Sequence, residues 1–100
     1  MDPYANHNLG VLNISLNKLQ LALPLLKTAL ETNPNQGQFW LSYIDALIKV
    51  NQLDDAMSVL EKGINRGLSG ENVEILKAKL KSISALELSV AFPQYRRHFS

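Results

Sequence analysis

The segment NKLQLALPLLKTAL (residues 17–30) resembles a later segment of the chain, NQLDDAMSVLEKGI (residues 51–64), at a fixed offset of 34 in the numbering. Both begin with asparagine, and both carry alanine at the sixth place, Ala22 in the first and Ala56 in the second. A fixed offset between similar segments is typical of structural repeats, in which each unit packs against the next. The sequence therefore predicts a stack of related units.

Apolar residues in each unit recur at helical spacing. Leu19, Leu23, Leu26 and Leu30 fall three or four residues apart, which places them on one face of a helix. A second set with the same spacing precedes them at Leu9, Leu12 and Leu16. The whole pattern predicts helices over residues 4–16, 20–32, 36–50, 54–66 and 70–84.

The residues between these helices are typical of turns. Asparagine tolerates the left-handed conformation that ends a helix, so Asn17 and Asn51 are expected to close the first helix of each unit. Pro34 disfavours helical geometry at the residue before it, and Gly67 has the same role as the asparagines. Ser69 is expected to cap the last helix. Each unit is therefore interpreted as two helices joined by a tight turn.

The composition is that of one small folded domain. Of the 100 residues, 46% are hydrophobic and 19% are charged, and ten basic and nine acidic residues leave a net charge of +1. This charge is too small to bind nucleic acid or an anionic membrane by itself. The absence of cysteine excludes disulfides and thiolate metal sites and fits a reducing compartment.

Targeting segments are not apparent. Residues 1–4 (MDPY) lack the basic and apolar regions of a signal peptide, and no apolar run approaches the roughly 20 residues that a membrane span needs. We therefore expect a soluble, cytoplasmic protein.

The positions of small and large residues in both units resemble the tetratricopeptide repeat family, whose helix pairs share the period seen here. The first unit, residues 3–36, matches at Leu9-Gly10, Ala22, Ala29 and Pro34, and the second, residues 37–70, at Trp40, Ala56 and Gly63. The chain departs from the family pattern at Asn6, Asn13, Ile44 and Leu68.

The resemblance implies an all-α, antiparallel helix-pair solenoid, a tetratricopeptide-like superhelix of two repeats plus a capping helix. The domain would span residues 3–84, with residues 71–84 as the first helix of a third unit, and residues 85–100 would form a tail. In this arrangement Gly10, Ala22, Ala56 and Ala78 are small because helix backbones cross closely there.

The resemblance also implies a function in protein–protein interaction, as a scaffold or binding module for a protein or peptide ligand in a concave groove lined by first helices. Family members that hold a C-terminal carboxylate use a basic and amide clamp, which we expect to be absent because only His7 could be cationic and only Asn72 retains an amide at those positions. The groove residues implied by the resemblance are Tyr4, His7, Asn8, Val11, Ser15, Gln38, Leu41, Ser42, Asp45, Lys49, Asn72, Leu76 and Lys79.

We find no pattern typical of an enzyme. Asp54 and Asp55 are adjacent, so on a helix their side chains point about 100° apart and cannot share a substrate. His7 and His98 have no metal-ligand spacing, and GLSG (residues 67–70) lacks the Gly-Lys-Ser/Thr of a phosphate loop. No catalytic residue, cofactor or metal is expected.

Two other functions remain as alternatives. The segment NPNQGQFWLSYIDALI (residues 33–48) resembles repeats beside transferase domains of large bacterial proteins, which would make the chain an accessory module of a glycosyl-, sulfo- or methyltransferase. Related helical repeats with a slightly longer period bind RNA, but the period of 34 and the small net charge argue against that function.

The far end of the stack is expected to expose an apolar stripe of Ile75, Leu76, Leu80 and Ile83, because about three units are needed for a stable stack. Two solutions would cover this stripe. A second copy could pack on it in a two-fold dimer. Alternatively, residues 86–92 could fold back as a short capping helix, with Phe92 over the stripe.

Overall fold

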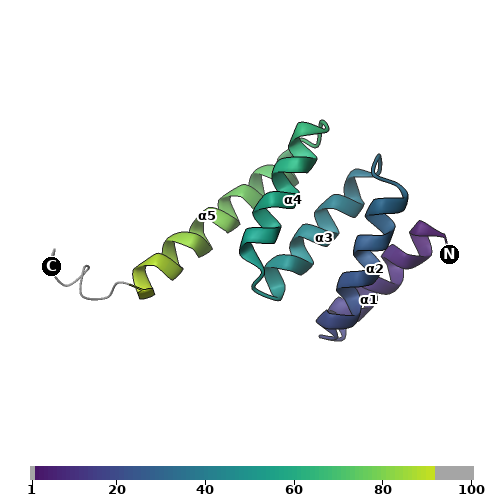
Figure 1. Cartoon of the computed structure of the whole chain (residues 1–100), viewed down its shortest axis with the longest axis horizontal. Helices are drawn as coiled ribbons and strands as arrows, with labels where there is room; N and C mark the ends of the chain where they lie inside the picture. Colours follow the sequence, from purple (N-terminus) through teal and green to yellow (C-terminus); the bar gives the residue numbers. More distant parts are fainter. Residues whose placement is uncertain (1, 92–100) are drawn as a thin grey trace, which may run out of the picture.

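The computed structural model describes residues 2–91, with side chains up to residue 86, and in that range the chain forms helices and turns without any strand (Figure 1). Successive helices are antiparallel and stack side by side. This architecture confirms the expected all-α helical-repeat solenoid. Its elements are α1 (Pro3–Ser15), α2 (Leu19–Thr32), α3 (Gly37–Lys49), α4 (Leu53–Asn65) and α5 (Glu71–Ala91).

The turn between α1 and α2 is made by Asn17, whose φ is +58°. Its backbone N–H donates to the carbonyl of Ile14 at 2.9 Å, and the N–H of Lys18 donates to that of Asn13 at 2.7 Å. Two such bonds around a left-handed residue form a Schellman motif, which satisfies carbonyls that the helix end leaves free. Asn51, with φ of +64°, makes the same pair of bonds after α3. The expected role of both asparagines is confirmed.

Gly67 ends α4 in the same way, with φ of +106°. The expectation that Ser69 caps the next helix is wrong, because α5 begins at Glu71 and the residue directly before it is Gly70. Gly70 has φ of +113°, a conformation that glycine adopts without steric cost. The chain therefore enters α5 through a glycine turn.

The small residues of the repeat lie where α1 and α2 cross. Ala22 and Leu26 are fully buried, and a Cβ added to Gly10 would lie 2.7 Å from Leu26 Cγ. The absence of a side chain at Gly10 thus permits a close approach, and α1 and α2 have the most extensive contact of any helix pair. At the corresponding place in the second unit, Ile44 is itself buried in the core.

Trp40 of α3 lies in the core between the two units. Its indole N–H donates to the carbonyl of Pro34 at 2.8 Å, so the polar edge of the ring is satisfied. The main core cluster consists of Ala29, Leu30, Phe39, Trp40, Ile44, Leu47, Ile48, Leu53, Ala56, Leu60, Val73, Leu76 and Leu80.

The third unit differs from the other two. Its counterpart of Asn17 and Asn51 is Ala85, and α5 does not turn there but continues to Ala91, past the expected end at residue 84. The expectation that Ala78 lies at a close helix crossing is wrong, since Ala78 is exposed and no described helix follows α5. The unit boundaries at residues 36 and 70 stay a prediction.

The expected apolar stripe at the far end is not an exposed surface. Leu76 and Leu80 are buried and Ile83 is half-buried against the core, so that only Ile75 of the four is exposed. The fold-back of a capping helix is also wrong for residues 86–91, because α5 continues through them. Phe92 and the rest of the tail lie outside the described residues.

Candidate functional site

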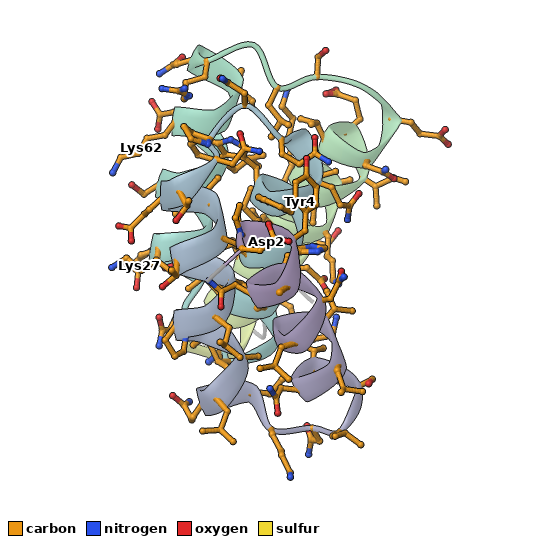
Figure 2. All side chains as sticks on the ribbon, turned by 90° about the vertical axis from the view of Figure 1, so that its right-hand side faces the viewer. Asp2, Tyr4, Lys27 and Lys62 are labelled. Carbon is orange, nitrogen blue, oxygen red and sulfur yellow. The ribbon has the colours of Figure 1, made fainter. Side chains whose placement is uncertain are left out.

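The helices lie in two layers, which are visible from the N-terminal end of the stack (Figure 2). Lys27 of α2 and Lys62 of α4 project to solvent from one layer, whereas Tyr4 of α1 lies in the other. We call the side formed by α1, α3 and α5 the first-helix face. Every residue expected in the groove belongs to one of these three helices.

An open depression of about 270 Å³ lies on the first-helix face between α3 and α5. It brings together six of the residues that the sequence analysis named, together with one that it missed, Ile75. The depression is lined by Gln38, Leu41, Ser42, Asp45, Asn72, Ile75 and Leu76.

The residue not predicted, Ile75, is an exposed apolar side chain of this lining. It is 54% exposed, whereas its neighbour Leu76 is a core residue with only an edge toward the depression. The repeat could have identified Ile75, because it occupies the place in the third unit that Leu41, another member of the lining, occupies in the second.

Aromatic rings join α1 to α3 at the other end of this face. His7 stacks on Phe39 with 4.8 Å between ring centroids, and Tyr4 meets Phe39 edge-on at 5.2 Å. Nε2 of His7 lies 2.7 Å from the hydroxyl oxygen of Ser42, within hydrogen-bonding distance. The side chains of His7 and Ser42 thus satisfy each other, and both help to hold α1 against α3.

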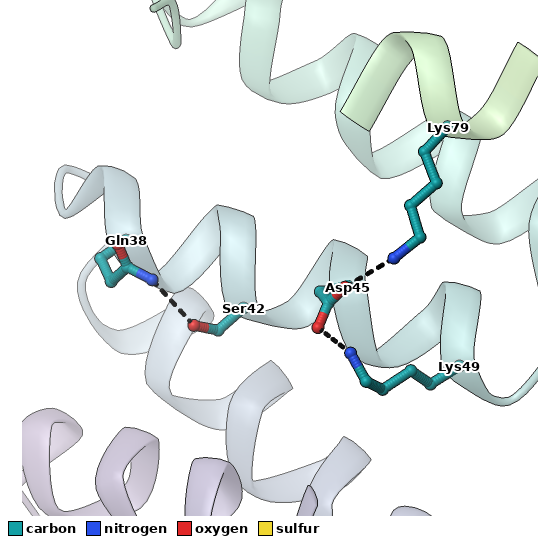
Figure 3. A network of polar contacts seen from close by, with 5 residues as sticks. All are labelled: Gln38, Ser42, Asp45, Lys49 and Lys79. Carbon is teal, nitrogen blue, oxygen red and sulfur yellow. Dashed lines mark hydrogen bonds and ion pairs between the residues drawn. The ribbon is translucent and has the colours of Figure 1, made fainter. Parts of the chain in front are cut away.

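Polar side chains continue along the first-helix face (Figure 3). The amide of Gln38 donates to the hydroxyl of Ser42 at 3.3 Å. Asp45 pairs with Lys49 one turn later and with Lys79 of α5 at 3.5 Å. These carboxylate and ammonium groups are partly exposed, so each pair contributes at most about 1 kcal/mol to stability. They leave one positive charge in excess beside the depression.

The remaining expected residues lie on α1, outside the depression. Asn8, Val11 and Ser15 are exposed. The hydroxyl of Ser15 donates to the carbonyl of Leu12 at 2.7 Å, one turn earlier in its own helix. These three residues thus belong to a helix of the first-helix face but not to the lining of the depression.

A family model described as tetratricopeptide repeat matches residues 14–80, more than half of the chain. The chain belongs to the tetratricopeptide repeat family. Comparisons with curated proteins and with solved structures gave no significant match. The match spans α2, α3, α4 and part of α5, and therefore includes both walls of the depression.

Tetratricopeptide repeats generally mediate protein–protein interactions and are typically non-catalytic. Within the residues that the structure describes, no group of three or more His, Cys, Asp or Glu side chains could hold a metal ion. In the same range, none of the helices is long and apolar enough to cross a membrane.

The opposite side of this tetratricopeptide repeat chain has a valley of about 450 Å³ between α2 and α4. Tyr43 lines it, together with Glu31 and Asp55 on the two walls. Burial, and then the carboxylates of Asp55 and Glu31, raise the pKa of the Tyr43 phenol above its ordinary value. The phenol therefore stays a hydrogen-bond donor to a higher pH than an exposed tyrosine.

Proposed function

We propose that this tetratricopeptide repeat chain is a non-catalytic scaffold module that binds a peptide or a helix of a partner protein along the first-helix face. The depression between α3 and α5 would be its centre. The observation that supports this proposal is the exposed apolar side chain of Ile75 beside Leu41, in a concave place between two helices. Ligand sites combine such apolar surface with a few polar groups.

The polar groups suit a peptide. The side-chain amides of Gln38 and Asn72 stand in the lining and can pair with the N–H and C=O groups of an extended segment. Lys49 and Lys79, which flank Asp45, favour a ligand with an acidic group. The proposed ligand is therefore a segment with an apolar side chain for the depression and an acidic residue next to it. The α1 residues named from the sequence would extend the site.

The class of ligand and the cellular location are part of the same proposal. The net charge of +1 supports a protein ligand over nucleic acid or a membrane, and a cytoplasmic, bacterial protein fits the absence of cysteine and the resemblance noted above. The alternative, an accessory module of a larger transferase, rests on the resemblance of residues 33–48 alone.

Selection from a displayed library of random peptides tests this proposal. The immobilised chain should enrich peptides that share an apolar and an acidic residue. Ile75→Glu should weaken their binding by about tenfold or more, since it removes the apolar contact and adds a repulsive charge. Because Ile75 is exposed, the variant should keep its circular dichroism spectrum and melting temperature.

Met57→Glu is the matched control, because Met57 is an exposed apolar residue of α4 in the other layer. This variant should bind the enriched peptides as the parent does. The proposal is wrong if no peptide is enriched. It is also wrong if the enriched peptides bind Ile75→Glu and the parent equally well.

A further inference from the structure

The outer side of α1, at the N-terminal end of the stack, is an exposed apolar surface. Leu9, Leu12 and Leu16 are 42%, 52% and 55% exposed. Ala5 of α1 and Leu21 of α2 are also exposed. Residues 5, 9, 12 and 16 follow the spacing of one helix face. Figure 2 views the molecule from this end, where α1 and α2 stand in front of the rest of the described chain. Such a contiguous patch usually marks an interface.

Comparison with the next repeat indicates what kind of element packs on this surface. The equivalent residues of α3, one repeat later, form the side by which the second helix pair packs on the first. Phe39 contacts Tyr4 and His7, and Ala46 packs with Ala22 and Leu26. The corresponding side of α1 is thus a helix-packing face without a described partner. The matching pairs are Ala5 and Phe39, Leu9 and Tyr43, Leu12 and Ala46, and Leu16 and Val50.

The far end of the stack presents charges to any head-to-tail partner. At the α5 positions that correspond to buried Trp40 and Leu47 of α3 stand Glu74 and Lys81, both exposed. A head-to-tail stack of copies would press the leucines of α1 against these charges, which are costly to bury. The same end also has an apolar groove between α4 and α5, lined in part by Leu60, Ile64 and Leu80. A symmetric association through α1, with the same surface from each copy, buries neither of these charges.

The charges around α1 favour a second copy as the occupant. From Pro3 to Ser15 the helix contains no Asp, Glu, Lys or Arg, so two copies meet without like-charge repulsion. Asp2 stands directly before the helix and Lys18 shortly after it, about 24 Å apart at the rise of an α-helix. In an antiparallel pair of α1 helices, Asp2 of each copy lies near the partner's Lys18. A parallel pair would bring like charges together.

We propose that this chain forms a two-fold dimer in which the α1 helices of two copies pack antiparallel through their leucines. In the register that pairs Asp2 with the partner's Lys18, Leu9 meets the partner's Leu12. The small side chain of Ala5 then faces the partner's Leu16. Together with the two α2 helices, the pair of α1 helices makes a four-helix layer. The depression between α3 and α5 contributes no residue to this interface.

Sedimentation velocity of the full chain, from micromolar to hundreds of micromolar, tests the dimer. The mass should rise from 11.2 kDa to twice that value with concentration. Leu12→Glu places two charges beside the two-fold axis and should hold the chain at the mass of one copy. Leu86→Glu, at an exposed leucine of α5, should leave the association unchanged. Circular dichroism should show both variants folded.

Cysteine cross-linking tests the antiparallel orientation, since the chain has no cysteine of its own. Single-cysteine variants Ala5→Cys and Leu16→Cys should form a disulfide with each other when mixed under oxidising conditions, but not with themselves. A parallel pair would give the opposite pattern and overturn the orientation. A measured mass of one copy at every concentration would overturn the proposed dimer. A Leu12→Glu variant that is folded and still dimeric would overturn it as well. Peptide binding is measured separately through Ile75→Glu, a position outside the α1 interface.

Discussion

Asn17 and Asn51 occupy equivalent places in the first and second units and adopt the same left-handed conformation, with φ of +58° and +64°. Each ends the first helix of its unit, and its backbone N–H and that of the next residue donate the same pair of hydrogen bonds to the helix end. The third residue in this series is Ala85, where α5 continues as a helix. The left-handed conformation costs most residues about 1–2 kcal/mol, and asparagine and glycine much less. The two units with asparagine at this place turn there, whereas the unit with alanine continues as a helix.

Asn51→Ala should lower the free energy of unfolding by about 1–2 kcal/mol, because alanine has to adopt the left-handed conformation without the tolerance of asparagine. Asn51→Gly is the matched control, and we expect it to be as stable as the parent or slightly more stable. Urea denaturation followed by circular dichroism measures both. Equal stability of the alanine and glycine variants would show that the turn tolerates any residue.

Gly10→Ala should destabilise the fold by about 1–3 kcal/mol, since the new Cβ would lie 2.7 Å from Leu26 Cγ and overpack the α1–α2 crossing. Gly37→Ala is its control. At Gly37 the nearest atom to an added Cβ is Leu68 Cδ1 at 3.4 Å, an ordinary contact. Thermal unfolding should therefore separate the two variants. A Gly10→Ala protein that melts with the parent would contradict the close crossing.

Trp40→Phe should lower the free energy of unfolding by about 1–3 kcal/mol, because it removes the hydrogen bond to Pro34 and part of the core packing. Tyr4→Phe, at a half-exposed ring, should change it by less than about 0.5 kcal/mol. Trp40 is the single tryptophan, so fluorescence of the parent reports directly on its burial. An emission maximum like that of tryptophan in water would be inconsistent with this placement.

Stability should fall as the pH rises above 10.0, the ordinary pKa of a tyrosine. The Tyr43 phenol has a raised pKa in the folded chain, so the unfolded chain releases its proton first and alkaline pH favours unfolding. The contribution is fully present below the unfolded pKa and is lost as the pH rises through the folded one. Tyr43→Phe should show a shallower decline than the parent in urea titrations at alkaline pH. Parallel curves for the two proteins would contradict this effect of burial.

The lining of the depression could be partly predicted from the sequence. The family resemblance predicts Gln38, Leu41 and Asn72 as groove residues on first helices, and the structure brings them together in the lining. The mutual hydrogen bond of His7 and Ser42 could not be foreseen, since the distance between α1 and α3 depends on how Phe39 fills the space between them.

The sequence by itself determined the period, the helix pairs and their turns, because these depend on local properties: the spacing of leucines and the backbone freedom of asparagine and glycine. Only the tertiary structure decided which apolar side chains remain exposed, because burial depends on every helix that packs against a residue. Leu80 and Leu12 look alike in the sequence. The first, on α5, packs into the core, whereas the second, on the outer side of α1, is half exposed.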